Sequence, residues 1–348
     1  MRAAARPASL RPAWLSLALA FLVAATVLGV LMGPVRLGVG PALAEIADRL
    51  PFVTVGSGLT DQQQAILWEL RIPRVVLAGL VGATLALAGA AYQGVFRNPL
   101  ADPYLLGVAA GAGLGATIVI AWAPPALDWP VDPLPLAAFA GALLGVSMTY
   151  VLGRAGGRAR TAATLILAGV ATASFLTAIQ TYVQQREDET VRQVYTWILG
   201  QLTTASWREV TLVLPYLLIG GATIVLHRRL LDVLSVGDEE AASLGVDTQR
   251  VRVLIVVAAS LGTAAAVSVS GLIGFVGVIV PHTVRLVFGT SYRLVIPLSL
   301  VFGAAFLILA DLVGRSLIAP AEIPIGVITA FLGAPFFLVV LRRSGRVA

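Results

Sequence analysis

Long apolar runs with almost no charged side chains divide the whole chain, and they constrain its fold more than any other feature. A transmembrane helix needs about 20 predominantly apolar residues to cross the hydrocarbon core of a bilayer. The chain is 58% hydrophobic and only 12% charged, which excludes an ordinary soluble domain. We therefore predict an all-α polytopic membrane protein, one domain over residues 1–348 with about ten transmembrane helices. The predicted spans lie near residues 14–32, 75–96, 104–123, 136–152, 161–183, 210–226, 253–270, 271–282, 295–312 and 325–341.

The arginine residues are distributed unevenly between the two sides that these spans define. If the N-terminus lies in the cytoplasm, the cytoplasmic segments hold 16 of the 24 arginines and six of the 18 acidic residues. The net charges are then +10 inside and −4 outside, as the positive-inside rule requires. We expect a multi-pass protein of the cell (inner, cytoplasmic) membrane with both termini in the cytoplasm. Residues 34–70 then form an external loop, with amphipathic pieces near 41–50 and 61–70, and the basic charge needs no nucleic-acid partner.

Residue types that the chain lacks exclude several kinds of chemistry. All 24 basic residues are Arg, so the chain cannot form a Walker A loop, which needs Lys to reach the phosphates, or a Schiff base. It has no Cys and only two histidines, His227 and His282, far apart in sequence. We therefore expect no catalytic residues, no metal site and no cofactor in this chain. If transport is driven by ATP, the ATP and its Mg²⁺ bind to a separate ATPase chain.

The longest polar interval in the C-terminal half, residues 228–252, predicts two short helices around a turn. Gly237 ends the first helix, and Gly245 closes the second as a left-handed cap. The acidic residues 238–240 fall in the first turn of the second helix, where the helix dipole favours negative charge. One interpretation is a solvated loop, but two spans can be joined by a few residues. A prefolded helical projection instead indicates a docking surface for a soluble partner.

Several long segments resemble one family, in the same order along the chain. They are RIPRVVLAGLVGATLALAGAAYQGVFRNPLADPYLLGVAAGAGLGA (Arg71–Ala116), GDEEAASLGVD (Gly237–Asp247), GLIGFVGVIVPHTVR (Gly271–Arg285) and AEIPIGVITAFLGAPFF (Ala321–Phe337). Together they resemble the FecCD-type permeases, the membrane subunits of ABC importers for iron chelates (siderophore or haem) and cobalamin. The resemblance covers nearly the whole chain from Arg71 onward, whereas the preceding residues match only in layout.

The resemblance implies a fold like that of the cobalamin-importer permeases and a defined assembly. The assembly is a homodimer with two cytoplasmic ATPase subunits and a periplasmic or lipid-anchored substrate-binding protein. A ferric siderophore is the first substrate to expect, because that class is the most common in the family, and haem and cobalamin are alternatives. An ion-coupled secondary transporter is a remote alternative, since that class typically carries acids or broken helices at mid-membrane and these spans are almost free of charge.

The resemblance also assigns residues to specific roles. Three arginines of the outer face are expected to dock the binding protein: Arg71, Arg74 and Arg315. The planar guanidinium group of an arginine can bind a carboxylate bidentately. The alternative for an arginine at a span end is snorkelling to headgroups. Coupling to the ATPase falls to Asp238, Glu239, Glu240, Ala241, Leu244 and Gly245. The inner gate comprises Asn98 and Leu100, in a proline-rich turn, with Thr161, Ala162 and Ala163, where cobalamin permeases have small hydroxyl residues.

Other side chains allow weaker predictions. The fifth span is rich in hydroxyl groups, which either bond within the helix or line a polar cavity. Asp311 lies four residues before Arg315, which predicts an ion pair on one helix face. His282, near a predicted helix end, is expected to be a structural donor and not a metal ligand. Glycines at four-residue spacing predict close helix contacts: Gly107, Gly111 and Gly115, and Gly141 and Gly145.

Overall fold

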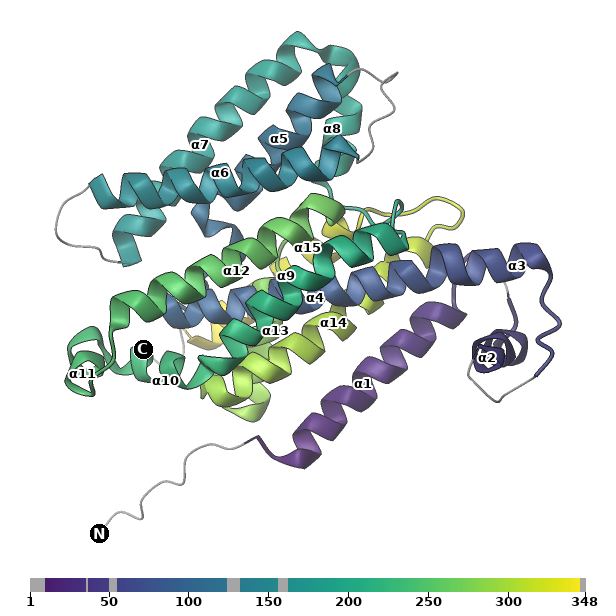
Figure 1. Cartoon of the computed structure of the whole chain (residues 1–348), viewed down its shortest axis with the longest axis horizontal. Coiled ribbons are helices and arrows are strands. Elements are labelled where there is room, and N and C mark those ends of the chain that lie inside the picture. Colours follow the sequence, from purple (N-terminus) through teal and green to yellow (C-terminus); the bar gives the residue numbers. More distant parts are fainter. Residues whose placement is uncertain (1–9, 36, 50–54, 124–131, 156–161, 345–348) are drawn as a thin grey trace.

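A computed structural model describes residues 10–35, 37–49, 55–123, 132–155 and 162–344, and these residues form a bundle of helices (Figure 1). Seven helical segments in this part of the chain are long and apolar enough to cross a membrane, and three shorter apolar helices accompany them. The long segments are α1 (Pro12–Leu31), α3 to α4 (Asp61–Val95), α6 (Pro133–Ala155), α7 (Ala162–Arg186), α9 (Trp207–Leu226), α12 (Thr248–Ser270) and α14 (Tyr292–Ser316). The shorter ones are α5 (Val108–Trp122), α13 (Val276–Phe288) and α15 (Ile325–Ser344). The prediction of an all-α polytopic fold is confirmed.

The remaining helices lie between the spans. On one side of the bundle, α2 (Val39–Asp48) precedes α3 (Asp61–Ala65), which continues through the π-helical turn η1 (Ile66–Arg71) into α4 (Ile72–Val95). On the other side lie α10 (Arg228–Val236) and α11 (Asp238–Ser243), together with the start of α1 and the end of α15 (Figure 1). The short elements that complete the fold are η2 (Pro103–Leu106), η3 (Asp188–Thr190) and α8 (Val191–Ile198).

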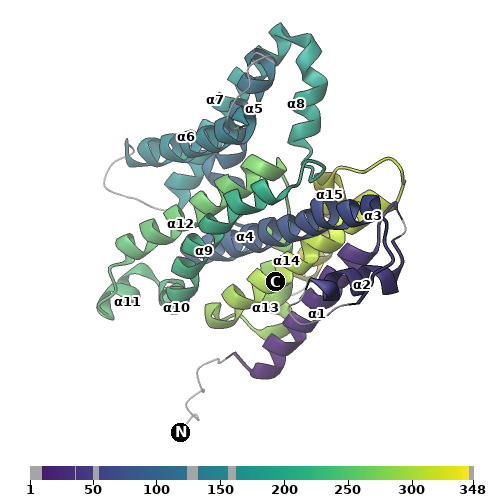
Figure 2. The same ribbon diagram turned by 45° about the vertical axis from the view of Figure 1, so that its right-hand side comes forward.

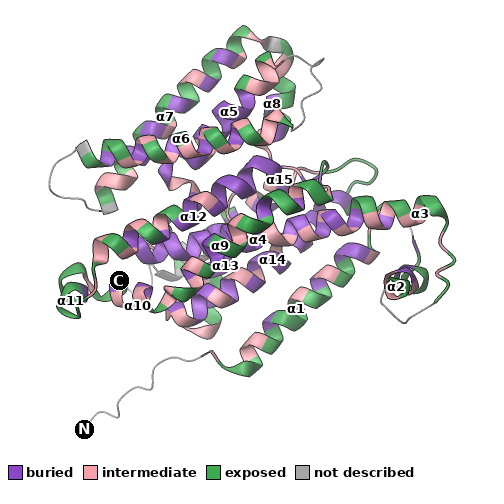
Figure 3. Cartoon of the chain, viewed as in Figure 1, coloured by how far each residue is buried: buried purple, intermediate pink, exposed green. Residues whose placement is uncertain are grey.

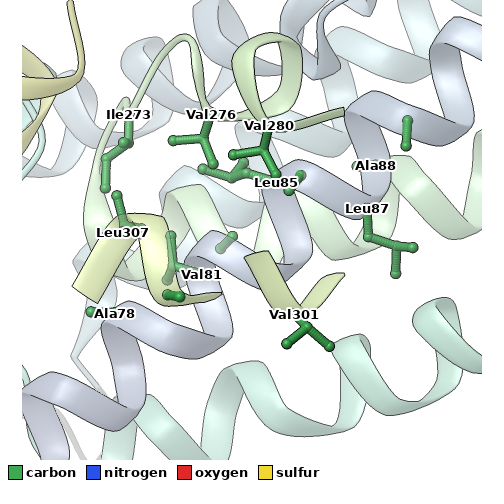
Figure 4. Close-up of a cluster of buried hydrophobic side chains, with 14 of the residues drawn as sticks. Ala78, Val81, Leu85, Leu87, Ala88, Ile273, Val276, Val280, Val301 and Leu307 are labelled. Atoms are coloured by element: carbon green, nitrogen blue, oxygen red, sulfur yellow. The ribbon is translucent and has the colours of Figure 1, made fainter. Parts of the chain in front are cut away.

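The centre of the bundle is α4, which is buried along nearly its whole length between α14, α12, α13 and α9 (Figures 1 and 3). Figure 4 shows Val81 and Leu85 of α4 in one cluster with Val276 of α13 and Leu307 of α14. A Cβ atom at Gly89 of α4 would collide with the backbone of α13. Because lipid supplies no hydrophobic force between helices, such close backbone approach is what holds α4 in place.

A second layer is formed by α5, α6 and α7, which lie to one side of the central group in both ribbon views, with α5 and α6 packed on α12 (Figures 1 and 2). The predicted glycine contacts join α5 to α6, because a Cβ atom at Gly111 would collide with the carbonyl of Gly141, and the reverse is also true. The outer face of α7 is exposed and apolar (Figure 3). This layer therefore offers a long apolar surface that the rest of the chain does not cover.

One predicted span begins later than the sequence suggested. Residues 271–275 are not helical, because Gly271 and Phe275 both adopt positive φ, of 68° and 69°. The helix α13 starts at Val276, and His282 lies in its interior instead of at a helix end. The ring of His282 packs edge-on against Phe336, with ring centroids 5.6 Å apart.

Candidate functional site

The helix α4 carries one arginine at each of its ends, and charged clusters form around both. Arg74 lies in its first turn, on the side of α2 and α3, and Arg97 follows its C-cap Phe96, on the side of α10 and α11 (Figure 1). We call the first the outer cluster, which comprises Arg74, Asp311, Arg315 and Glu322. We call the second the inner cluster, which comprises Arg97, Asp238 and Arg252.

In the outer cluster, Arg74 holds two carboxylates at once. Its Nη2 lies 2.8 Å from Asp311 Oδ1 and 2.8 Å from Glu322 Oε2, and its Nη1 donates to Glu322 Oε1 at 2.9 Å. Arg315 Nε lies 3.4 Å from Asp311 Oδ2, which confirms the ion pair predicted from their spacing. The side chains of Asp311 and Arg315 are each 3% exposed, and that of Arg74 is 15% exposed. Asp311 is thus a buried carboxylate between two cations.

The other predicted docking arginine, Arg71, is buried and bound to backbone carbonyls. Its Nη1 donates to the carbonyls of Val30 and Leu31, both at 3.3 Å, and its Nη2 donates to that of Val35. Arg315 likewise donates to the carbonyl of Gly29. These bonds fix the end of α1 to α4 and α14. Arg71 and Arg315 therefore have structural partners in their own chain, and among the three arginines Arg74 is the most accessible to another protein; the docking role itself stays a prediction.

The predicted pair of short helices is present at the inner end. Gly237 separates α10 from α11 with a φ of 140°, and Gly245 follows α11 with a φ of 81°, in the left-handed region that favours glycine. Leu231 and Leu234 of α10 are buried, and α10 packs on α4 and α14. Ala241 of α11 is buried, whereas the other five predicted coupling residues are exposed: Asp238, Glu239, Glu240, Leu244 and Gly245. The projection is prefolded, and its role in coupling stays a prediction.

Asp238, the first residue of α11, is bound to its own chain. Its Oδ1 lies 2.6 Å from Arg97 Nη2 and 3.0 Å from Arg252 Nη2, on α12. The Arg252 side chain is 9% exposed, whereas those of Arg97 and Asp238 are 39% and 46% exposed. Arg97 itself has a φ of 50°, which is uncommon for a residue other than glycine. Sequence reasoning missed these ion pairs, which link α11 directly to the end of α4 and to α12.

The predicted gate residues lie in two separate segments. Asn98 Oδ1 accepts a hydrogen bond from Leu100 N at 2.9 Å, which closes an Asx turn. Leu100 is 47% exposed. Ala163 is exposed in the first turn of α7. Ala162 begins that helix, and Thr161 lies outside the described residues. Closure of a gate by these residues stays a prediction.

The turn that contains Asn98 is tied to the neighbouring helix by polar side chains that the sequence did not single out. Gln93 Nε2 donates to the carbonyls of Ala101 and Gly277, at 3.3 and 3.1 Å, and Arg285 donates to Gln93 Oε1. Asp102 accepts a hydrogen bond from Tyr104 N at 2.8 Å. Burial raises the pKa of Asp102 to about 6, although the bond from Tyr104 N opposes this shift. The turn is therefore a polar, partly buried joint between α4 and α13.

The hydroxyl groups of α7 do not share one role. Thr181 Oγ1 donates to the carbonyl of Thr177 at 2.9 Å, whereas the buried Thr172 Oγ1 has no hydrogen-bond partner.

His227 Nδ1 lies 2.7 Å from the carbonyl of Thr223, as expected for a structural histidine. Within the residues that the structure describes, no group of three His, Cys, Asp or Glu side chains is arranged to hold a metal ion.

Known proteins are similar to this chain in sequence. The sequence profile of the FecCD transport family matches residues 21–343. The cobalamin import permease BtuC of Halobacterium salinarum is 43% identical over 285 residues, 82% of this chain and 75% of that protein. The ABC transporter permease YvrB of Bacillus subtilis, itself uncharacterized, is 40% identical over 94% of this chain and 92% of its own length. The hemin transport permease HmuU of Yersinia pestis is 37% identical over 85% of this chain and 89% of its length.

The architecture has a counterpart among solved structures. An inward-facing conformation of a metal-chelate type ABC transporter superposes with a TM-score of 0.82 and 27% identity, covering 96% of this chain and all of that one. The family profile spans nearly the whole chain, and the central helices, the projection of α10 and α11 and the apolar composition all agree with a transport subunit. The chain therefore belongs to the FecCD transport family and is a permease subunit of an ABC transporter.

Proposed function

We propose that this permease imports a metal chelate, with a ferric siderophore as the first candidate, from an external binding protein to the cytoplasm. Fe(3+)-citrate permeases of Bacillus subtilis, 36% and 38% identical to this chain, support a ferric chelate. Cobalamin is the second candidate, because the halobacterial cobalamin permease shares 43% identity. The protein works in the cytoplasmic membrane as a homodimer with two ATPase subunits, which bind ATP and Mg²⁺, and with both termini in the cytoplasm.

One observation carries the mechanism. Asp238, the first residue of α11, is paired with Arg97, which directly precedes Asn98 in the gate turn. A displacement of α11 by the ATPase therefore pulls on the gate turn through one ion pair and on α12 through Arg252. Because α10 also packs on α4 and α14, the movement reaches the centre of the bundle as a rigid-body shift.

The exposed apolar faces support a second copy and a pathway between the copies. Phe331 of α15 is 74% exposed and Leu167 and Phe175 of α7 are 70% and 57% exposed. An apolar cavity of about 550 Å³ opens along α15, lined by Gly326 and Phe331 among others. A pathway of this kind makes weak, unspecific contacts with a bulky chelate, so selectivity resides in the binding protein.

Reconstitution in liposomes tests the proposal. The permease is combined with its ATPase and binding protein and offered labelled ferric siderophore, haem and cobalamin, with and without ATP. We expect ATP-dependent uptake of one of them, and the identity of that substrate separates the candidates. Uptake that requires an ion gradient and ignores ATP would contradict the proposal.

A double variant tests the coupling role of the projection. Glu239 and Glu240 are both exposed on α11, and replacing both with Ala removes two charges from the surface offered to the ATPase. We expect ATP-driven uptake to fall severalfold while the permease stays folded. Uptake at the full rate would show that this surface does not transmit the movement.

A further inference from the structure

A cavity of about 420 Å³ is lined mainly by residues of α6 and α12. The end of α6 and the start of α12, which carry these residues, lie toward α10 and α11 (Figure 1). Its walls are mainly aliphatic and include Val146, Leu165, Val256 and Val257. Two arginines, Arg154 and Arg252, belong to the same lining. The cavity thus combines an apolar slot with a positively charged margin, and neither the gate nor the outer cluster uses it.

Arg252 is the more informative of the two arginines. Its side chain is 9% exposed, and its Nη2 is paired with Asp238, but its Nε is buried without a hydrogen-bond partner. A buried N–H group of a cation that lacks an acceptor is costly, and such groups are rare in folded proteins. The cavity that Arg252 lines can supply the missing acceptor if an anion enters it. Arg154 adds a second charge there and lies over the ring of Tyr150, 5.5 Å from its centroid.

We propose that this cavity binds an anionic phospholipid of the cytoplasmic leaflet, with its phosphate on Arg252 and Arg154 and one acyl chain along Val146, Val256 and Val257. Cavities with basic side chains between transmembrane helices on the cytoplasmic side suit anionic headgroups. A soluble anion leaves the aliphatic slot empty, and a zwitterionic phospholipid brings its own ammonium group next to the arginines. An anionic lipid satisfies both parts of the cavity.

Lipid at this place touches the inner cluster through one shared residue. The phosphate accepts from Arg252 Nε, while Asp238 keeps the Nη2 atom, so both partners can be bound together. The headgroup then fixes the guanidinium that anchors α11 to α12. An effect of anionic lipid on ATP-driven uptake rests on the proposed function, whereas binding of the lipid does not.

Binding is tested on the full-length permease purified with its ATPase subunits. The complex is stripped of lipid in detergent and titrated with phosphatidylglycerol or phosphatidylcholine of the same chain length, and bound lipid is counted by native mass spectrometry. We expect phosphatidylglycerol to be retained over phosphatidylcholine. Arg252→Gln should lower the affinity of the complex for phosphatidylglycerol about fivefold or more. Arg250→Gln is the matched control, because that side chain lies on the same helix, is 89% exposed and is outside the cavity lining.

A second pair of variants tests the apolar slot without touching the charges. Val257 lines the cavity and is 49% exposed, so Trp at this position fills the slot while the helix is kept, and bound phosphatidylglycerol should be lost. Leu254→Trp is the control, at a residue that is 42% exposed on α12 but outside the lining. Equal retention of the two lipids, equal effects of the two arginine variants, or unchanged binding in Val257→Trp would each overturn the proposal. Lipid binding without any change in uptake would instead contradict the link to coupling.

Discussion

The clusters at the two ends of α4 are built from the same residue types but differ in how far they are buried. In the outer cluster, the carboxylate of Asp311 is 3% exposed and is held by Arg74 and Arg315. In the inner cluster, the carboxylate of Asp238 is 46% exposed and is held by Arg97 and Arg252. Exposed ion pairs contribute about 0–1 kcal/mol to stability, whereas removing one partner of a buried pair costs about 3–5 kcal/mol.

This difference assigns different mechanical roles to the two ends. The outer cluster and Arg71 join the end of α1, the start of α4 and the end of α14. Separating these three helix ends would break buried ion pairs and hydrogen bonds, which costs much free energy. The inner cluster holds a projecting helix by contacts that water and salt weaken. A transporter that alternates between two states needs a fixed part and a part that moves, and the movement we propose therefore starts at the inner end.

The largest expected effect follows from removing the buried outer carboxylate. Asp311→Ala leaves Arg74 with Glu322 alone and leaves the buried Arg315 without its carboxylate partner. We expect the free energy of unfolding in detergent micelles to fall by about 3–5 kcal/mol. Asp238→Ala is the matched change at the inner end, with an expected loss of about 1 kcal/mol or less. Equal losses in the two variants would remove the distinction between the ends.

A pH effect of intermediate size is expected from Asp102, which follows α4 at the inner end and has no arginine on it. Its pKa of about 6 in the folded protein lies above the ordinary 3.8, so the folded state holds this proton more tightly than the unfolded state. The contribution of Asp102 to the free energy of unfolding is therefore most favourable below pH 3.8 and is lost as the pH rises through 6. The loss amounts to up to about 3 kcal/mol. Asp102→Asn should remove this loss and stabilise the protein at neutral pH.

The control for Asp102 is another aspartate in the same kind of turn. Asp132 accepts a hydrogen bond from Leu134 N at 3.0 Å, much as Asp102 accepts from Tyr104 N, but it is exposed. The free energy of unfolding is measured from pH 3 to pH 8 for both Asn variants and the parent protein. If the free energy of unfolding of Asp102→Asn depended on pH in the same way as that of the parent protein, this would contradict the raised pKa of Asp102.

A smaller effect on stability, but a clear one on transport, is expected from Asp238→Asn. The substitution keeps the shape of the side chain and removes the charge that joins α11 to Arg97 and Arg252. Stability should fall by about 1 kcal/mol or less. Under the proposed mechanism, ATP-driven uptake should fall severalfold while ATP hydrolysis continues, because the ATPase would then move a helix that no longer pulls on the gate turn. Asp61→Asn is the matched control, because it is the same change at an exposed aspartate on the opposite side of the bundle and leaves this link in place. ATP hydrolysis and uptake should both continue in that variant as in the parent protein.

The sequence predicted the features that depend on local order. Apolar runs located the spans, and Gly237 and Gly245 located the projecting helices, because positive φ and helix ends are properties of a few neighbouring residues. The Asp311–Arg315 pair was predictable for the same reason, since one helical turn separates the two residues. The start of α13 was misplaced because glycines 271 and 274 allow an extended segment as readily as a helix end.

Contacts between distant segments had no such signal. Arg97 and Asp238 are 141 positions apart, and Arg74 and Glu322 are 248 positions apart, with no periodic pattern to connect them. Burial of Arg71 and Arg315 was equally hidden, because an arginine at a span end looks the same whether it faces solvent, lipid headgroups or backbone carbonyls. The sequence therefore identified the arginines at the span ends. Only the packing of α1, α4 and α14 determined which of them are bonded within the chain and which are accessible to a partner.

The smallest expected change in stability, from Glu322→Gln, sharpens the comparison most, because Glu322 is the most exposed member of the outer cluster at 31%. Arg74 remains bound to the buried Asp311, so the free energy of unfolding should change by about 0.5 kcal/mol or less. If Arg74 receives a glutamate of the binding protein, that glutamate must first displace Glu322. The variant should then bind the binding protein several times more tightly, as measured by titration calorimetry in nanodiscs at low salt, where charge pairs are least screened. Unchanged affinity would show that Arg74 serves the outer cluster alone, and a loss of affinity would assign the docking contact to Glu322 itself.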